Sequence, residues 1–199
     1  PWATGGTATS ALAIAAGADG GPVYDLTNGV GNDGTGNQAL VLPTPVVIPA
    51  DADCVIYVKA NLGALESGLT PIGSSTAGHN VSISTSDGGG DHSVAVGLDG
   101  VGASYVTAVM AGQTATGVYL LRFTRASGVW SFACTGVASS AMTPTGTVSG
   151  AISFNTLLAF GGGTLSSFSM TGMYLQKLKI WTGTSSPDTA YETANGGAL

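Results

Sequence analysis

The carboxylate side chains are the residues best suited to chemistry in this sequence, and their spacing argues against glycoside hydrolysis. Hydrolysis of a glycosidic bond needs two acids that flank it, about 5–9.5 Å apart. The two glutamates, Glu66 and Glu192, fall in loop-like or terminal contexts. Acids alternate along a possible strand only at Asp51 and Asp53, just after Pro49. We therefore expect no catalytic residues and no enzymatic activity.

Histidine and cysteine form no nucleophile or zinc motif. The two histidines, His79 and His92, are not accompanied by a Gly-x-Ser-x-Gly elbow, and we interpret both as ordinary surface residues of a loop or edge strand. Cys54 and Cys134 are distant from each other and from both histidines in sequence, which argues against zinc. We interpret them as buried free thiols, with a disulfide across the core as the alternative.

Two oxygen-rich segments could supply the hard ligands that calcium prefers. They are Asp87–Asp91 and Asn28–Asn37. Asp and Asn beside Gly commonly form turns, and we favour that interpretation for both segments. Asp87 and Asp91 remain the candidate calcium ligands, and no other cofactor is expected.

Glycan binding would require exposed aromatic rings that stack on sugar faces. Trp2, Tyr105 and Tyr191 are the candidates, whereas Trp130 and Trp181 are expected to face the core. Their spacing alone does not gather the candidates into one site.

Charge is sparse and acidic: charged residues make up 8% of the chain and the net charge is -6. An average soluble domain has about 25% charged residues, so this surface suggests a cell exterior or an assembled particle. Clustered cations are needed to bind phosphate, and here the cations are scattered along the chain, which argues against nucleic acid and anionic membranes. Apolar runs fall short of the roughly 18 residues of a membrane helix, so no membrane insertion is expected. The cations are Lys59, Arg122, Arg125, Lys177 and Lys179.

The chain divides at about residue 38. Residues 1–38, rich in Gly, Thr and Ala, are predicted to form an arm or lead-in, and residues 39–199 a β-sandwich domain. Ser186-Pro187-Asp188 predicts the start of a short C-terminal helix, with Ser186 as N-cap and Pro187 as the first helical residue. The expected strands are Ala39–Leu42, Val46–Ile48, Cys54–Ala60, Asn80–Thr85, His92–Leu98, Ser104–Met110, Gly117–Arg125, Val129–Thr135, Ala151–Phe154, Leu157–Phe160 and Met170–Trp181, and Val23–Leu26 in the lead-in is also strand-like.

Several of these segments resemble the concanavalin A-like, laminin-G-like lectin-fold family. Tyr119–Arg125, a small turn and Val129–Phe132 are similar to a hairpin typical of that family. Met173–Trp181 resembles its last strand and Ser185–Thr193 the short helix after it. Val47–Pro49 and Val55–Lys59 resemble the early strand that opens the sheet. The resemblance implies an all-β fold, an antiparallel two-sheet jelly-roll sandwich with one short C-terminal helix. The family includes lectins, carbohydrate-binding modules, glucanases and adhesive ectodomains, and similar domains occur on bacteriophage virion surfaces.

Together these observations lead us to expect a non-enzymatic virion protein, such as a head decoration, fibre or tail-surface subunit, that mediates assembly or host attachment. The alternative is a secreted carbohydrate-binding module or lectin. The expected partners are capsid or tail proteins, further copies of the chain in a homo-oligomer and cell-surface glycans. The expected location is the virion surface or the extracellular space.

Overall fold

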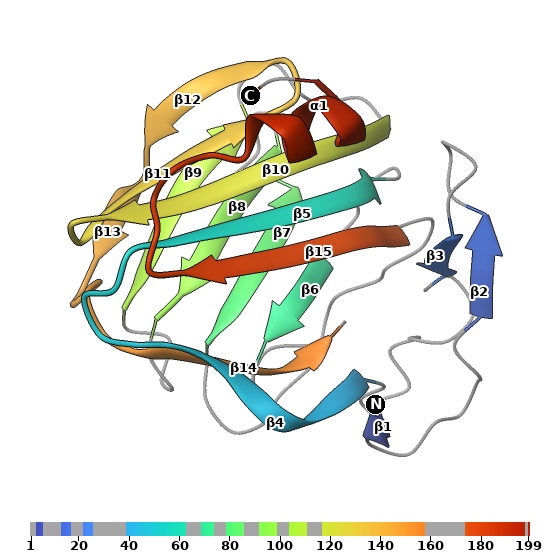
Figure 1. The fold of residues 1–199 in the computed structure, drawn as a ribbon, viewed down its shortest axis with the longest axis horizontal. Helices are drawn as coiled ribbons and strands as arrows, with labels where there is room; N and C mark the ends of the chain where they lie inside the picture. The colour runs from blue at the N-terminus through green and yellow to red at the C-terminus, as the bar shows by residue number, and fades with distance from the viewer. Residues whose placement is uncertain are drawn as a thin grey trace.

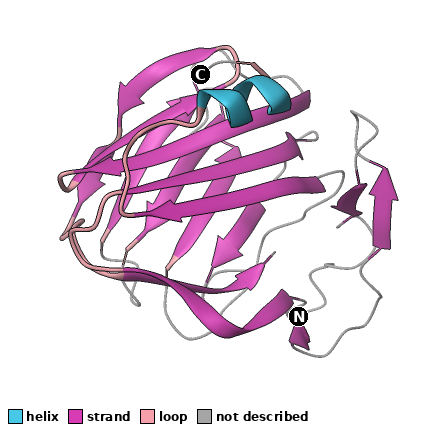
Figure 2. Cartoon of the chain, viewed as in Figure 1, coloured by secondary structure: helices cyan, strands magenta, loops and turns pink. Residues whose placement is uncertain are grey.

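The structure is a computed structural model of all 199 residues. It describes residues 3–5, 13–16, 22–25, 39–62, 69–73, 79–85, 92–98, 104–110, 117–157, 174–197 and 199. Within this part of the chain the fold is two antiparallel sheets that face each other, with one helix on the outside of the second sheet (Figures 1 and 2).

Sheet A has the strand order β1-β4-β14-β6-β7-β8-β9-β13. Its strands are β1 (Ala3–Gly5), β4 (Ala39–Ile48), β14 (Ile152–Leu157), β6 (Leu69–Gly73), β7 (Asn80–Thr85), β8 (His92–Gly97), β9 (Tyr105–Met110) and β13 (Thr143–Thr145). Sheet B has the order β12-β11-β10-β5-β15-β3-β2. Its strands are β12 (Val137–Ala141), β11 (Val129–Cys134), β10 (Gly117–Ala126), β5 (Cys54–Leu62), β15 (Tyr174–Thr182), β3 (Pro22–Asp25) and β2 (Ala13–Ala16).

The core lies between the sheets because alternate residues of each strand point inward. In sheet A, Val94 and Val96 of β8 are buried while Ser93 and Ala95 are only partly covered. In sheet B, Ile56 and Val58 of β5 belong to the same buried cluster as the sheet A valines. Burial of apolar surface from both sheets is the main stabilising contribution in a sandwich.

The central strands of sheet B are also covered on their outer face. Val55, Tyr57 and Leu120 form a second buried cluster, against which Trp181, Tyr191 and Leu199 pack. Tyr191 belongs to α1 (Thr189–Asn195), so the C-terminal helix covers the outer face of β5 and β10. This explains why β5 is buried over Cys54–Ala60 on both faces.

The predicted fold class is confirmed: the chain is an all-β, two-sheet sandwich with a short C-terminal helix. Some element boundaries were wrong. The two strands predicted at 39–42 and 46–48 form one strand, β4, that continues through Pro43 and Pro45. The strands at 69–73, 137–141 and 143–145 were missed, because they are short and rich in Gly, Pro, Ser or Thr.

The helix begins later than predicted. Asp188, not Ser186, is the N-cap, because its side chain accepts a hydrogen bond from the Tyr191 backbone N–H at 3.0 Å. Pro187 therefore precedes the helix instead of opening it. In the described part of the chain, no helix has the length and apolar character needed to cross a bilayer.

Three short strands from the predicted lead-in join the sheets. β1 pairs with β4, β2 pairs with β3, and β3 pairs with β15. The division of the chain at residue 38 stays a prediction.

Candidate functional site

Four of the five cations lie on one surface, the outer face of sheet B. Tyr57 of β5 is the direct neighbour of Arg122 on β10 and of Lys179 on β15. In the adjacent row Lys59 is the direct neighbour of Lys177. We call Lys59, Arg122, Lys177 and Lys179 the cationic face. The cations are scattered in sequence, but four of the five lie together in space. The expectation that nucleic acid and anionic membranes are not partners stays a prediction.

A buried carboxylate sits at the centre of the cationic face. Glu192 of α1, only 1% exposed, accepts a hydrogen bond from the Tyr57 hydroxyl at 2.8 Å and forms an ion pair with Arg122 at 2.5 Å. Its second carboxylate oxygen accepts from the Leu199 backbone N–H at 3.3 Å. Arg122 and Tyr57 thus form a site that binds a carboxylate, which in this structure belongs to the chain itself.

Tyr57 is a hydrogen-bond donor in this site. Burial and the hydrogen bond to Glu192 raise the pKa of Tyr57 from 10.0 to about 12, so its hydroxyl keeps its proton at neutral pH. The same hydroxyl accepts from the Asp188 backbone N–H at 2.9 Å. Tyr57 therefore stabilises a carboxylate but is a poor general base in this arrangement.

Aromatic rings surround Lys179 beside the carboxylate site. The Lys179 Nζ lies 3.9 Å from the ring centroid of Trp181 and 4.5 Å from that of Tyr191. Tyr57 contacts both rings, with centroid distances of 5.8 Å to Trp181 and 5.0 Å to Tyr191. Trp181, Tyr191 and Lys179 are each partly exposed. They form an accessible surface with flat apolar rings and a cation, which we call the aromatic–lysine cluster.

The remaining contacts of α1 also go to the cationic face. Lys179 Nζ pairs with Asp188 at 3.3 Å and Lys177 Nζ donates to Asn195 at 2.5 Å. The hydrogen bond from the Tyr191 N–H and then the charge of Lys179 lower the pKa of Asp188. The helix segment and the cationic face are thus joined by two ion pairs and by a hydrogen bond from a lysine to a neutral amide.

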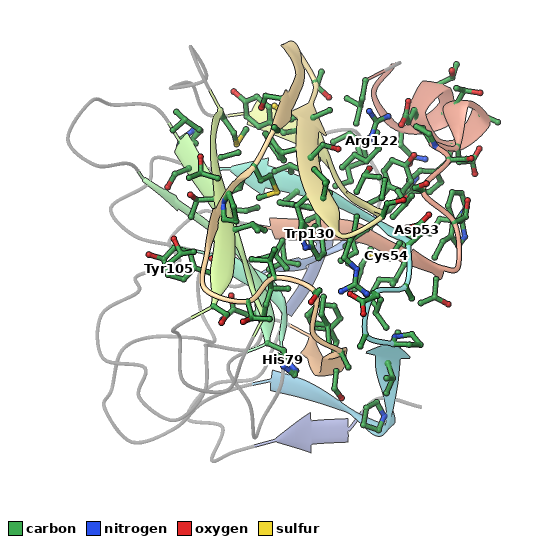
Figure 3. All side chains as sticks on the ribbon, turned by 90° about the vertical axis from the view of Figure 1, so that its left-hand side faces the viewer. Asp53, Cys54, His79, Tyr105, Arg122 and Trp130 are labelled. Carbon is green, nitrogen blue, oxygen red and sulfur yellow. The ribbon has the colours of Figure 1, made fainter. Side chains whose placement is uncertain are left out.

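Two of the three predicted glycan residues lie in the described part of the chain, on opposite faces of the sandwich. Tyr191 lies in the aromatic–lysine cluster, whereas Tyr105 lies on the outer face of sheet A, on the opposite side of the sandwich from Arg122 (Figure 3). Trp2 lies outside the described residues. Trp130 is buried as predicted, but the prediction for Trp181 was wrong, because Trp181 shares the outer face with Lys179. Which of these residues bind a glycan stays a prediction.

The candidate acids that the structure describes do not converge. Asp53 is structural, because it accepts from the Ser127 N–H at 2.7 Å and from the Ser185 hydroxyl at 3.2 Å. Glu192 is neutralised by Arg122, and Glu66 lies outside the described residues. The calcium candidates Asp87 and Asp91 also lie outside them. Within the described ranges, no three His, Cys, Asp or Glu side chains come together as a metal site would need.

The histidines and cysteines have structural environments. The Nδ1 of His79 accepts from the Ser153 backbone N–H at 3.0 Å. The prediction of a surface position was wrong for His92, which is 3% exposed and has no hydrogen-bond partner among the described residues at either ring nitrogen. Cys54 and Cys134 are buried free thiols, and burial raises the pKa of each to about 11.

Comparison with known proteins gives a likeness of fold. No family model and no curated protein matches the chain. Among solved structures, a polysaccharide lyase of family 18, aly-SJ02, matches with 12% identity and a TM-score of 0.45, over 82% of this chain and 88% of that chain. An alginate lyase from Alteromonas sp. 272 matches with 12% identity and a TM-score of 0.43, over 84% of this chain and 90% of that chain.

These matches correct the functional expectation. Both solved structures are named as lyases, which runs against a non-enzymatic virion surface protein and against the absence of activity. A pair of flanking acids is a requirement of glycoside hydrolysis. Lack of an acid pair therefore does not exclude a different bond-breaking reaction. The phage assignment has no support from these matches, and we do not retain it.

Proposed function

We propose that this chain binds a carboxylate-bearing polysaccharide on the outer face of sheet B. The observation that carries the proposal is the gathering of Lys59, Arg122, Lys177 and Lys179 on one face of a chain whose net charge is -6. Because the rest of the chain is acidic, this arrangement is a local attraction for an anionic partner.

The kind of anion follows from the groups around Arg122. The guanidinium and the Tyr57 hydroxyl already hold a carboxylate, that of Glu192. Beside them the partly exposed rings of Trp181 and Tyr191, which flank Lys179, add apolar surface of the kind that lines ligand sites. A polymer of uronic acids combines these two features, since each sugar carries both an apolar face and a carboxylate.

Binding of soluble alginate, a polymer of uronic acids, tests the proposal when compared with a neutral glucan. We expect alginate to bind and the glucan not to bind, with affinity that falls as salt is raised, because salt screens charge attraction. Lys179→Gln should weaken alginate binding about fivefold, equivalent to about 1 kcal/mol for a partly exposed ion pair. The same mixtures are assayed for alginate cleavage by the ultraviolet absorbance of the double bond that elimination creates.

The matched control is Thr107→Glu on the outer face of sheet A. Thr107 is partly exposed on β9, and this change shifts the net charge by the same one unit as Lys179→Gln. Thr107→Glu should bind like the wild type. Equal loss in the two variants, or equal binding of alginate and glucan by the wild type, would contradict the proposal.

A further inference from the structure

The carboxylate of Glu192 occupies the position that a bound uronate would need. Arg122 and Tyr57, its two side-chain partners, are 8% and 0% exposed. The aromatic–lysine cluster is open at the edge of the site, where the Lys179 side chain is 34% exposed. An external carboxylate can therefore meet Lys179 directly, but can reach Arg122 only after Glu192 leaves.

The segment that carries Glu192 depends on the sheet for its stability. α1 has seven residues, and an isolated helix of fewer than about 12 is not stable in water. Gly196 and Gly197 follow it, both with positive φ, so the helix ends abruptly. What holds the helix in place is the contacts of Asp188, Glu192 and Asn195 with Lys and Arg, together with the packing of Tyr191.

A polyanion competes for those same contacts. Arg122, Lys177 and Lys179 each bind an oxygen of the α1 segment, and each would bind an oxygen of a uronate polymer equally well. The exchange replaces one carboxylate by another, so it leaves no buried charge unpaired.

We propose that residues 186–197, together with Leu199, form a displaceable cover, and that a uronate carboxylate replaces Glu192 at Arg122 and Tyr57 when polymer binds. This inference rests on the proposed function and adds its regulation. Contact at Lys179 comes first, and opening of the cover then exposes the rest of the cationic face. The chain thereby limits access of smaller or weaker anions to Arg122.

A cross-link that holds the cover closed tests the inference. A Cβ at Gly196 would lie 3.5 Å from the Leu120 Cβ, within the range of about 3.5–4.5 Å that a disulfide needs. The double variant Leu120→Cys/Gly196→Cys can therefore tie the end of α1 to β10. Gly196 has a φ of +156°, so the variant is strained in both redox states. Comparison of its own oxidised and reduced forms removes that effect.

We expect the oxidised variant to bind alginate at least about tenfold more weakly than the same variant when reduced, because the open form is no longer populated. Wild-type affinity should not change with reductant, since Cys54 and Cys134 are buried and burial raises the pKa of both thiols to about 11. Equal binding in both redox states would overturn the cover and leave the proposed function standing. Failure of the wild type to bind alginate would overturn the proposed function itself.

Hydrogen exchange on the wild-type chain tests whether the cover opens, without use of the double variant. At saturating alginate, the backbone amides of residues 189–197 should lose protection, while those of β5 and β10 should keep theirs. Unchanged or increased protection of residues 189–197 overturns the cover, even if the double variant binds poorly in both redox states.

Discussion

Two arginines on the same strand have different roles because their side chains lie on different faces of the sheet. Arg122 and Arg125 are three positions apart on β10, so their side chains leave opposite faces of sheet B. Arg122 joins the cationic face, whereas Arg125 is fully buried on the core side. Alternation predicts that the two arginines lie on different faces of the sheet. It does not predict that Arg125 is buried, because an arginine enters a core only where acceptors surround it.

The acceptors around Arg125 are backbone carbonyls. Its guanidinium donates to the carbonyl oxygens of Pro49 at 2.6 Å, Ala52 at 2.6 Å and Gly150 at 2.9 Å, and it lies over the ring of Trp130. These contacts join the turn before β5 to the segment before β14. Arg125 is thus a structural residue, separate from the proposed site.

Arg125→Lys should destabilise the fold strongly, because one ammonium cannot replace donors that reach three carbonyls in different directions. We expect a loss of about 2–4 kcal/mol in the free energy of unfolding, on the scale of charged hydrogen bonds left unmade. Urea unfolding of wild type and variant measures it. A loss near zero would show that the three contacts do not matter for stability. Val129→Thr, at an exposed position next to the same hairpin turn, is the neutral control.

At the scale of the element, β5 combines two different surfaces. Its inward residues Cys54, Ile56 and Val58 enter the core, and its outward residues Val55, Tyr57 and Lys59 lie on the face that α1 covers. The period-two pattern predicts the inward set correctly. It cannot predict that the outward set is buried too, because that depends on where a helix more than 130 residues later packs, as the Tyr57–Glu192 contact shows.

Tyr57→Phe should destabilise the protein at neutral pH by about 1–2 kcal/mol, because Glu192 loses a donor and the Asp188 N–H loses an acceptor. The pKa of Tyr57 is raised from 10.0 to about 12, so the folded chain holds this proton more tightly than the unfolded chain. Its contribution is therefore complete below pH 10 and is lost as the pH rises toward 12. Urea unfolding across this range should show the difference between wild type and variant narrowing. A difference that stays constant would contradict the assigned hydrogen bond.

At the scale of the whole molecule, the sequence predicts the fold better than the site. Short alternating runs separated by Gly-rich turns predict the strands of the sandwich, including Asn80–Thr85 with both ends correct. The cationic face could not be predicted, because Lys59, Arg122 and Lys179 meet only through the register of β5 with β10 and β15. Register depends on long-range pairing, and a shift by one residue would send each cation to the other face.

Part of the site did carry a signal in the sequence. Tyr57 and Lys59 alternate on one strand, and Lys177, Lys179 and Trp181 alternate on another. Each alternating set implies that its strand has a polar outward side. The pattern does not show that the two strands are neighbours in the sheet. The expectation of no activity considered only paired acids, a nucleophile motif and zinc, and so left other reactions open.

The central claim is that an acidic polysaccharide binds at the cationic face of sheet B. The most direct measurement is a chemical-shift titration of the isotope-labelled chain with a uronic acid oligosaccharide. The claim predicts saturable shifts at Lys179, Trp181 and Tyr191, and also at Arg122 and Glu192 as the cover opens. Shifts confined to the opposite face around Tyr105 and Thr107, or none at all, would contradict it.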